Sequence, residues 1–122
     1  MDHVRFEKIQ DTSFLILDYS RASEDLMIDR LEYARELLLE RNIITPIIII
    51  VNDKNYFTPK FMRKSELVYA KIKHLIKKDI GILGLSSTQR QILKSFVILG
   101  NRKLREFHSK DEAIKFHRFG AS

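Results

Sequence analysis

A run of five β-branched residues, 47–51, constrains the fold of this chain more than any other stretch. Side chains that branch at Cβ have restricted χ1 torsions, and they suit the pleated surface of a sheet better than a helix. The run has no polar alternation, and it is far shorter than a membrane-spanning helix, which needs about 20 residues. Strands that are apolar on both faces lie inside parallel or mixed sheets covered by helices. The run therefore predicts a central strand of an α/β domain.

The segments around this strand predict four more strands. The pattern of residues 4–9 and 14–17, joined by the turn-forming residues 11–13, indicates an antiparallel hairpin at the N-terminus. Apolar runs predict a further strand at 80–85 and a short one at 103–107. The first strand alternates imperfectly, which is typical of the edge of a sheet.

Each predicted helix follows a polar cap. The caps are Ser23, Thr58 followed by Pro59, and two capping boxes, Ser86 with Gln89 and Ser109 with Glu112. The first helix is expected to extend to about Arg41, and the third to stop near Gly100 and Asn101. The resulting order, β-β-α-β-α-β-α-β-α, predicts a single α/β domain over residues 1–122. We expect a mixed, mostly parallel five-stranded sheet with an N-terminal hairpin and about four helices on its two faces.

Charge is distributed unevenly along the chain, which has a formal net charge of +6. Between residues 54 and 78, eight Lys and Arg accompany one acidic residue, Glu66, whereas residues 1–42 hold ten Asp and Glu against six Lys and Arg. Such an asymmetry can orient an acidic partner. A solvated helix face is the simpler explanation of the basic segment, and both interpretations stay open at this point.

No catalytic or metal-binding motif stands out in the sequence. The absence of cysteine excludes disulfides, thiolate metal sites and a cysteine nucleophile, and neither a P-loop, a dinucleotide fingerprint nor a nucleophile elbow is present. The histidines have no metal-ligand spacing; they are His3, His74, His108 and His117. We therefore expect no catalytic residue, metal or cofactor. An enzyme that uses Asp18, Asp53 or Ser86 is the lowest-ranked alternative.

The location of the protein is predicted from two further absences. The charged N-terminus does not resemble a signal peptide, and no apolar run has the length of a spanning helix. These features predict a cytoplasmic protein without a transmembrane segment.

Aromatic residues accompany the basic ones between positions 54 and 78, as in many nucleic-acid-binding surfaces. Phe61 belongs to an apolar helical stripe, whereas Tyr56 and Phe57 lie in the preceding loop and can be exposed. We predict at most weak, salt-sensitive binding to nucleic acid.

The order of elements and three segments of the chain resemble the STAS superfamily, and more narrowly the bacterial sporulation anti-sigma-factor-antagonist-like domains of the STAS/SEC14 type. The segments are the strand 47–53 that runs into a polar loop, residues 81–87 before a helix, and the closing strand and helix start at 105–113. The resemblance covers nearly the whole chain through soft patterns. It implies a small regulatory, non-enzymatic domain that binds a protein partner or, as in SEC14-like relatives, a lipid.

A phosphorylated serine is part of the switch in classical anti-sigma-factor antagonists, where it follows the central strand in a D-S-S/T-G-like motif. In this chain Asp53 matches the aspartate of that motif, but no serine or glycine follows it, so the classical phosphoserine motif is absent. Thr58 is the nearby hydroxyl and the possible phosphoacceptor, and its other role is the helix N-cap.

These observations lead to one main prediction and several alternatives. We expect a protein-interaction module that binds an acidic partner surface through Asp53, Lys54, Asn55, Tyr56, Phe57, Thr58, Lys60, Arg63 and Lys64. The alternative is a carrier of a lipid or a small apolar ligand, bound near Tyr56, Phe57 and Met62. Self-association as a homodimer also remains open.

Overall fold

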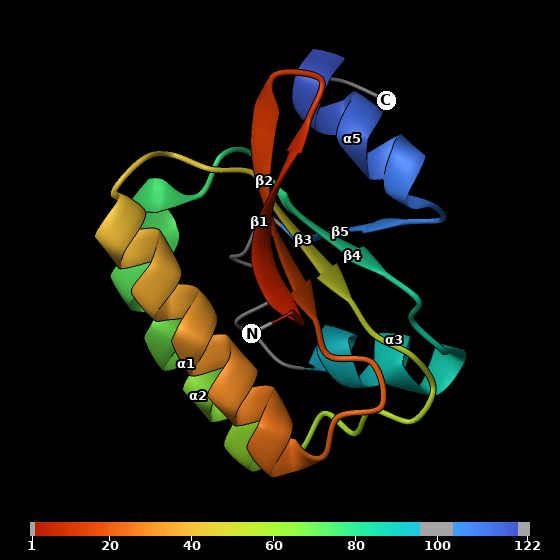
Figure 1. Cartoon of the computed structure of the whole chain (residues 1–122). Coiled ribbons are helices and arrows are strands. Elements are labelled where there is room, and N and C mark those ends of the chain that lie inside the picture. Colours follow the sequence, from red (N-terminus) through yellow and green to blue (C-terminus); the bar gives the residue numbers. More distant parts are fainter. Residues whose placement is uncertain (1, 96–103, 120–122) are drawn as a thin grey trace.

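Residues 47–50 form the middle strand of a five-stranded sheet in the computed structural model, which describes residues 2–95 and 104–119 (Figure 1). The strands are β1 (Val4–Ile9), β2 (Thr12–Asp18), β3 (Ile47–Ile50), β4 (Ile80–Leu83) and β5 (Leu104–Phe107). They lie in the order β1-β2-β3-β4-β5. β1 is antiparallel to β2, and every other neighbouring pair is parallel. The predicted mixed, mostly parallel sheet with an N-terminal hairpin is confirmed.

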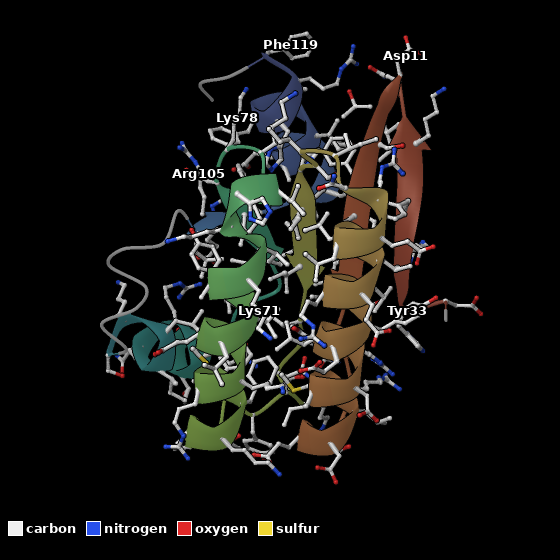
Figure 2. The ribbon with its side chains drawn as sticks, turned by 90° about the vertical axis from the view of Figure 1, so that its left-hand side faces the viewer. Asp11, Tyr33, Lys71, Lys78, Arg105 and Phe119 are labelled. Carbon is white, nitrogen blue, oxygen red and sulfur yellow. The ribbon has the colours of Figure 1, made fainter. Side chains whose placement is uncertain are left out.

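Helices cover both faces of the sheet, as predicted. They are α1 (Glu24–Arg41), α2 (Pro59–Ile72), the short 3-10 helix η1 (Lys73–Leu75), α3 (Ser87–Ser95) and α5 (Lys110–Phe119). The helices α1, α2 and α3 lie on one face of the sheet, and among the described helices α5 lies on the opposite face (Figure 1). Figure 2 shows α1 and α2 side by side. Together these elements make one α/β domain.

Local capping signals place the helix ends well. The Oγ of Ser23 accepts a hydrogen bond from the backbone N–H of Leu26 over 3.3 Å. α1 then ends at Asn42, which takes the left-handed conformation with φ 54° that commonly stops a helix. Ser109 caps α5 by accepting a hydrogen bond from the backbone N–H of Glu112 over 3.1 Å. The stop predicted near residues 100–101 lies outside the described residues.

The hairpin turn is tighter than the sequence predicts. Gln10 and Asp11 form it with positive φ angles of 46° and 73°, and Ile9 pairs directly with Thr12. Two-residue turns of this kind match the right-handed twist of the flanking strands. Thr12 therefore belongs to β2, and the turn predicted at residues 11–13 begins one residue earlier.

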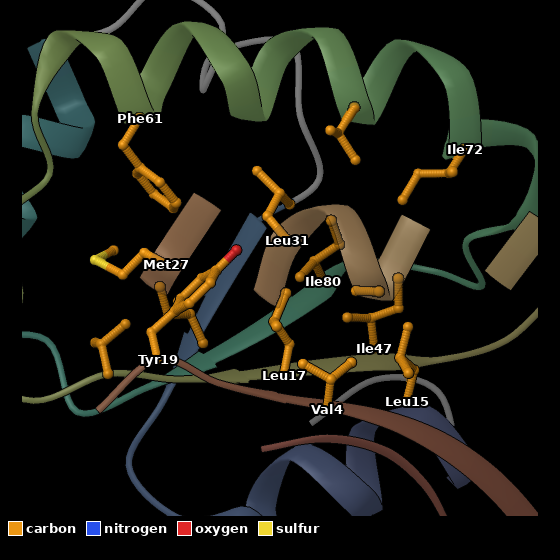
Figure 3. Close-up of a cluster of buried hydrophobic side chains, with 14 of the residues drawn as sticks. Val4, Leu15, Leu17, Tyr19, Met27, Leu31, Ile47, Phe61, Ile72 and Ile80 are labelled. Carbon is orange, nitrogen blue, oxygen red and sulfur yellow. The ribbon is translucent and has the colours of Figure 1, made fainter. Parts of the chain in front are cut away.

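The strands alternate between two apolar layers. In β2, Leu15 and Leu17 are buried under α1 and α2, whereas Phe14 and Ile16 are buried beneath α5. Figure 3 shows the larger layer, in which side chains from the sheet meet those of the two helices. An apolar stripe of α1 lies in this layer; its members are Met27, Leu31, Ala34 and Leu38.

Two glycines let the sheet pack closely. A Cβ on Gly84 would lie 2.0 Å from the carbonyl oxygen of Val51, and Gly84 has a φ of 91°. A Cβ on Gly81 would meet the ring of Phe107 at 3.1 Å. The strand predicted at 80–85 therefore ends at Leu83, since the backbone turns at Gly84.

Within residues 2–95 and 104–119, no helix combines the length and the apolar composition needed to cross a membrane.

Candidate functional site

The carboxyl edge of the parallel strands carries the predicted partner-binding loop, residues 53–58. In many α/β proteins a ligand crevice opens at this edge, where the strand order reverses and successive helices pass to opposite faces. Here β2 to β5 follow one another in the sheet without reversal, and α1, α2 and α3 lie on the same face. The topology therefore provides no crevice of that kind, and the loop itself is the feature to consider.

Asn55 fixes this loop from inside. Its side chain is only 2% exposed, and its Nδ2 donates to the backbone carbonyls of Tyr19 (2.7 Å) and Ala22 (3.2 Å). Its Oδ1 accepts a hydrogen bond from the backbone N–H of Asn52 over 3.0 Å. The prediction that Asn55 contacts a partner is therefore wrong, because this amide connects the loop to the segment before α1.

Gln89 holds the loop from the opposite side. Its Nε2 donates to the backbone carbonyls of Asn52 (2.7 Å) and Asn55 (2.9 Å). Its Oε1 accepts from the backbone N–H of Ser86 over 2.9 Å, while the Oγ of Ser86 accepts from the backbone N–H of Gln89 over 3.2 Å. The predicted capping box is confirmed, and its glutamine also ties α3 to the loop.

Tyr56 and Phe57 point in different directions. Tyr56 is 78% exposed, whereas Phe57 is buried and stacks on Phe61 with ring centroids 6.1 Å apart. The inclusion of Phe57 in the partner-binding surface is therefore corrected, because burial in the apolar layer outweighs its position in a loop. Tyr56 projects outward between two buried neighbours, Asn55 and Phe57.

Thr58 acts as the N-cap of α2. Its Oγ1 accepts from the backbone N–H of Phe61 over 3.1 Å and donates to the carboxylate of Glu24. Both capacities of the hydroxyl are thus used within the fold. Phosphorylation of Thr58 would remove the hydrogen bond that it donates to Glu24 and place a phosphate beside that carboxylate, so the contacts favour the capping role.

Part of the basic charge on α2 is used between the helices. The Nζ of Lys64 lies 2.6 Å from Oε1 of Glu32 on α1, and the Nζ of Lys60 lies 4.0 Å from Oε1 of Glu24. The hydrogen bond from Lys64 is the largest effect on Glu32 and lowers the pKa of its carboxyl group against the opposing effect of burial. Lys64 therefore pairs with α1, and its role in partner binding stays a prediction.

Several exposed side chains follow one another along the chain from this loop into α2. Arg63 and Leu67 are one helical turn apart on α2, both are exposed, and Leu67 has an exposed fraction of 64%. No ion pair of Arg63 is found among the described residues. We call the following set the Tyr56 surface: Lys54, Tyr56, Lys60, Arg63 and Leu67. Asp53 is exposed at its margin.

Asp18, one of the carboxylates of the enzymatic alternative, accepts hydrogen bonds within its own turn. Oδ1 of Asp18 accepts hydrogen bonds from the backbone N–H and the hydroxyl of Ser20, at 2.9 and 2.5 Å, in a local turn. Across the described ranges, no group of three or more His, Asp or Glu side chains could hold a metal ion.

The roles of two residues of this region, Leu67 and Gln89, were not predicted from the sequence. Leu67 could have been found, since it is an apolar residue outside the apolar stripe of a predicted amphipathic helix. The second role of Gln89 had no sequence signal, because its partners, Asn52 and Asn55, lie more than 30 residues earlier in the chain.

Comparisons with known proteins add no relative. No protein-family model matches this chain, and searches of curated proteins and of solved structures found no significant match. The resemblance to the STAS superfamily therefore stays a prediction, and function has to be argued from the surface described above.

Proposed function

We propose that this protein is a non-enzymatic, regulatory interaction module that binds an acidic segment of a partner protein through the Tyr56 surface. The observation that carries the proposal is the exposure of Tyr56 on a loop whose two neighbouring side chains are buried. The STAS-like element order is compatible with such a role.

A fixed tyrosine suits the centre of a binding surface. Tyrosine is enriched among the residues that dominate binding energy, because it offers a large apolar ring and a polar hydroxyl. Binding also costs conformational entropy for every segment that becomes ordered. Here the hydrogen bonds of Asn55 and Gln89 hold the loop in place before any partner arrives. The cost of ordering Tyr56 is correspondingly small.

The charges around Tyr56 determine the kind of partner. Lys54, Lys60 and Arg63 are basic and exposed, and Leu67 supplies a second apolar contact on the same helix as Arg63. Basic residues at the rim of an interface mainly increase the association rate with an acidic surface. The expected partner therefore presents acidic residues around one or two apolar side chains.

Nucleic acid is a poorer candidate for this surface. Binding of single strands relies on several exposed rings on which bases stack. Phe57 and Phe61 are buried, which leaves Tyr56 as the strongly exposed ring of this region.

Site-specific crosslinking tests the proposal. A photoreactive phenylalanine analogue replaces Tyr56 in one variant and Phe119 in the other, since Phe119 is also strongly exposed but lies on α5. We expect one protein in cells to crosslink from position 56 and not from position 119. Arg63→Glu should weaken that crosslink, whereas Phe119→Ala should not.

The outcomes separate the alternatives. A crosslink from position 56 to a second copy of the chain would identify a homodimer in place of a different partner. Equal crosslinking from both positions, or no crosslink that depends on position 56, would contradict the assignment of this surface.

A further inference from the structure

An apolar cavity lies between the sheet and α2, apart from the Tyr56 surface. It has a volume of about 100 Å³ and is lined almost entirely by apolar side chains of the larger core layer. Its lining includes Tyr19, Leu31, Phe57, Phe61, Met62 and Ser65. Phe57 and Met62 are two of the residues that the sequence suggested for an apolar ligand, whereas Tyr56 points to solvent.

Tyr19 places a hydrogen-bond donor in this apolar setting. The residue is 3% exposed, and in the described part of the chain its hydroxyl group has no hydrogen-bond partner. Figure 3 shows its ring directed from the sheet toward α2, beside Leu31 and Phe61. Its ring meets that of Phe61 edge to face, with centroids 5.3 Å apart. A buried tyrosine usually finds a partner for its hydroxyl, because an unmade hydrogen bond is costly in the interior.

We infer that this cavity is a binding site for a compact, uncharged apolar molecule with one hydrogen-bond acceptor. That acceptor receives a hydrogen bond from the hydroxyl of Tyr19. Burial raises the pKa of Tyr19, so its hydroxyl remains a donor at neutral pH. The hydroxyl of Ser65, on α2, is a second polar group along the lining. This inference is independent of the proposed interaction with a protein.

The volume limits the ligand. Sites for drug-sized ligands measure roughly 300–1,000 Å³, and an engineered apolar cavity of about 150 Å³ takes up benzene. A cavity of about 100 Å³ is smaller than that one, so a single six-membered ring is the upper limit for a ligand. A long-chain lipid does not fit such a volume, which favours the small-ligand version of the carrier alternative.

Methyl NMR with two probes tests the inference. Cyclohexanone has a carbonyl acceptor, whereas cyclohexane has nearly the same shape without one. We expect both probes to shift the methyl signals of Leu31 and Val68, which line the cavity, in a saturable way. The methyl groups of Ile16 and Ile48, in the layer under α5, should not move. The hydroxyl of Tyr19 should also stabilise bound cyclohexanone, through a hydrogen bond to the carbonyl oxygen that cyclohexane lacks.

Tyr19→Phe is the matched variant, because it removes the hydroxyl and keeps the ring. It should weaken cyclohexanone binding about 3- to 10-fold, the ratio that one net hydrogen bond supplies, and leave cyclohexane binding unchanged. No saturable shift with either probe would overturn the assignment of the cavity as a binding site. Equal weakening of both probes, or of neither, would overturn the role of Tyr19.

Discussion

The side-chain amide of Gln89, in the first turn of α3, donates a hydrogen bond to the backbone carbonyl of Asn55 over 2.9 Å. Asn55 in turn donates through its own side chain to the carbonyl of Tyr19. The two buried amides connect the segments that follow three neighbouring strands, β2, β3 and β4. The loop that carries Tyr56 is therefore fixed by the interior of the domain.

Replacement of Gln89 should destabilise the domain. In Gln89→Ala the buried carbonyl of Asn55 loses the donor that Gln89 supplies, whereas the carbonyl of Asn52 keeps a hydrogen bond from the backbone N–H of Asn55. An unsatisfied buried polar group costs about 1–3 kcal/mol. We expect the free energy of unfolding, measured by urea denaturation, to fall by that amount. Gln91→Ala is the control, since Gln91 is exposed on the same helix. Equal midpoints for the two variants would contradict the role of the Gln89 amide.

The two glycines of the β4 region should differ in their tolerance of alanine. Gly84→Ala places a Cβ against a backbone oxygen that has no freedom to rotate away, at a φ that costs most residues about 1–3 kcal/mol by itself. In Gly81→Ala the obstacle is the ring of Phe107, which can shift by a few tenths of an ångström. We expect Gly84→Ala to lower the melting temperature far more than Gly81→Ala. Similar losses would show that the close approach at Gly84 is not the deciding contact.

Thr58 should contribute to stability through its hydroxyl. Thr58→Ala removes the cap of α2, and loss of an N-cap costs about 0.5–2 kcal/mol. Thr58→Ser keeps the hydroxyl and should retain most of the stability, whereas Thr58→Val keeps the shape and should behave like Thr58→Ala. Chemical denaturation of the three variants provides the measurement. A stable Thr58→Val variant would be inconsistent with the capping role.

His117 should make the stability of the domain depend on pH. Its imidazole is 1% exposed, neither ring nitrogen has a hydrogen-bond partner among the described residues, and Phe14 lies against it with ring centroids 5.8 Å apart. Burial is the main cause that lowers the pKa of His117 from 6.5 to about 4. The charges of Lys78 and Lys77 act in the same direction, and Asp79 opposes them.

The sign of the effect follows from proton binding. Between pH 4 and pH 6.5 the unfolded chain binds a proton at His117 that the folded protein does not bind, so stability falls as the pH decreases through this window. The loss is at most about 3.5 kcal/mol, since each pH unit between the two pKa values is worth about 1.4 kcal/mol. The carboxyl groups of Glu7, Glu32 and Glu106 are ion-paired, which lowers their pKa values from 4.5. Their contribution to the pH dependence of stability therefore falls at lower pH than that of His117.

His117→Phe isolates this contribution. The variant fills the same apolar site without a titrating group, so its unfolding free energy should change less between pH 7 and pH 5 than that of the parent. Urea denaturation at these two pH values provides the comparison. Identical pH dependence in both proteins would show that burial of His117 does not control acid stability.

Local chemistry in the sequence determined the elements and their order. The β-branched run made a central strand because restricted χ1 torsions favour a sheet, and Ser23, Thr58 and Ser109 began helices because their hydroxyls accept nearby backbone N–H groups. These effects act between residues a few positions apart. The mixed α/β sheet followed from the alternation of these segments.

Only the tertiary structure decided which side chains of residues 52–64 face solvent. Asn55 and Phe57 are drawn inward by groups that lie far away in the sequence, and Lys64 is paired with Glu32 on another helix. Tyr56 stays outside because its two neighbours are buried. A sequence states the type of each side chain, whereas its burial and its charge partner depend on surfaces that meet only when the chain folds.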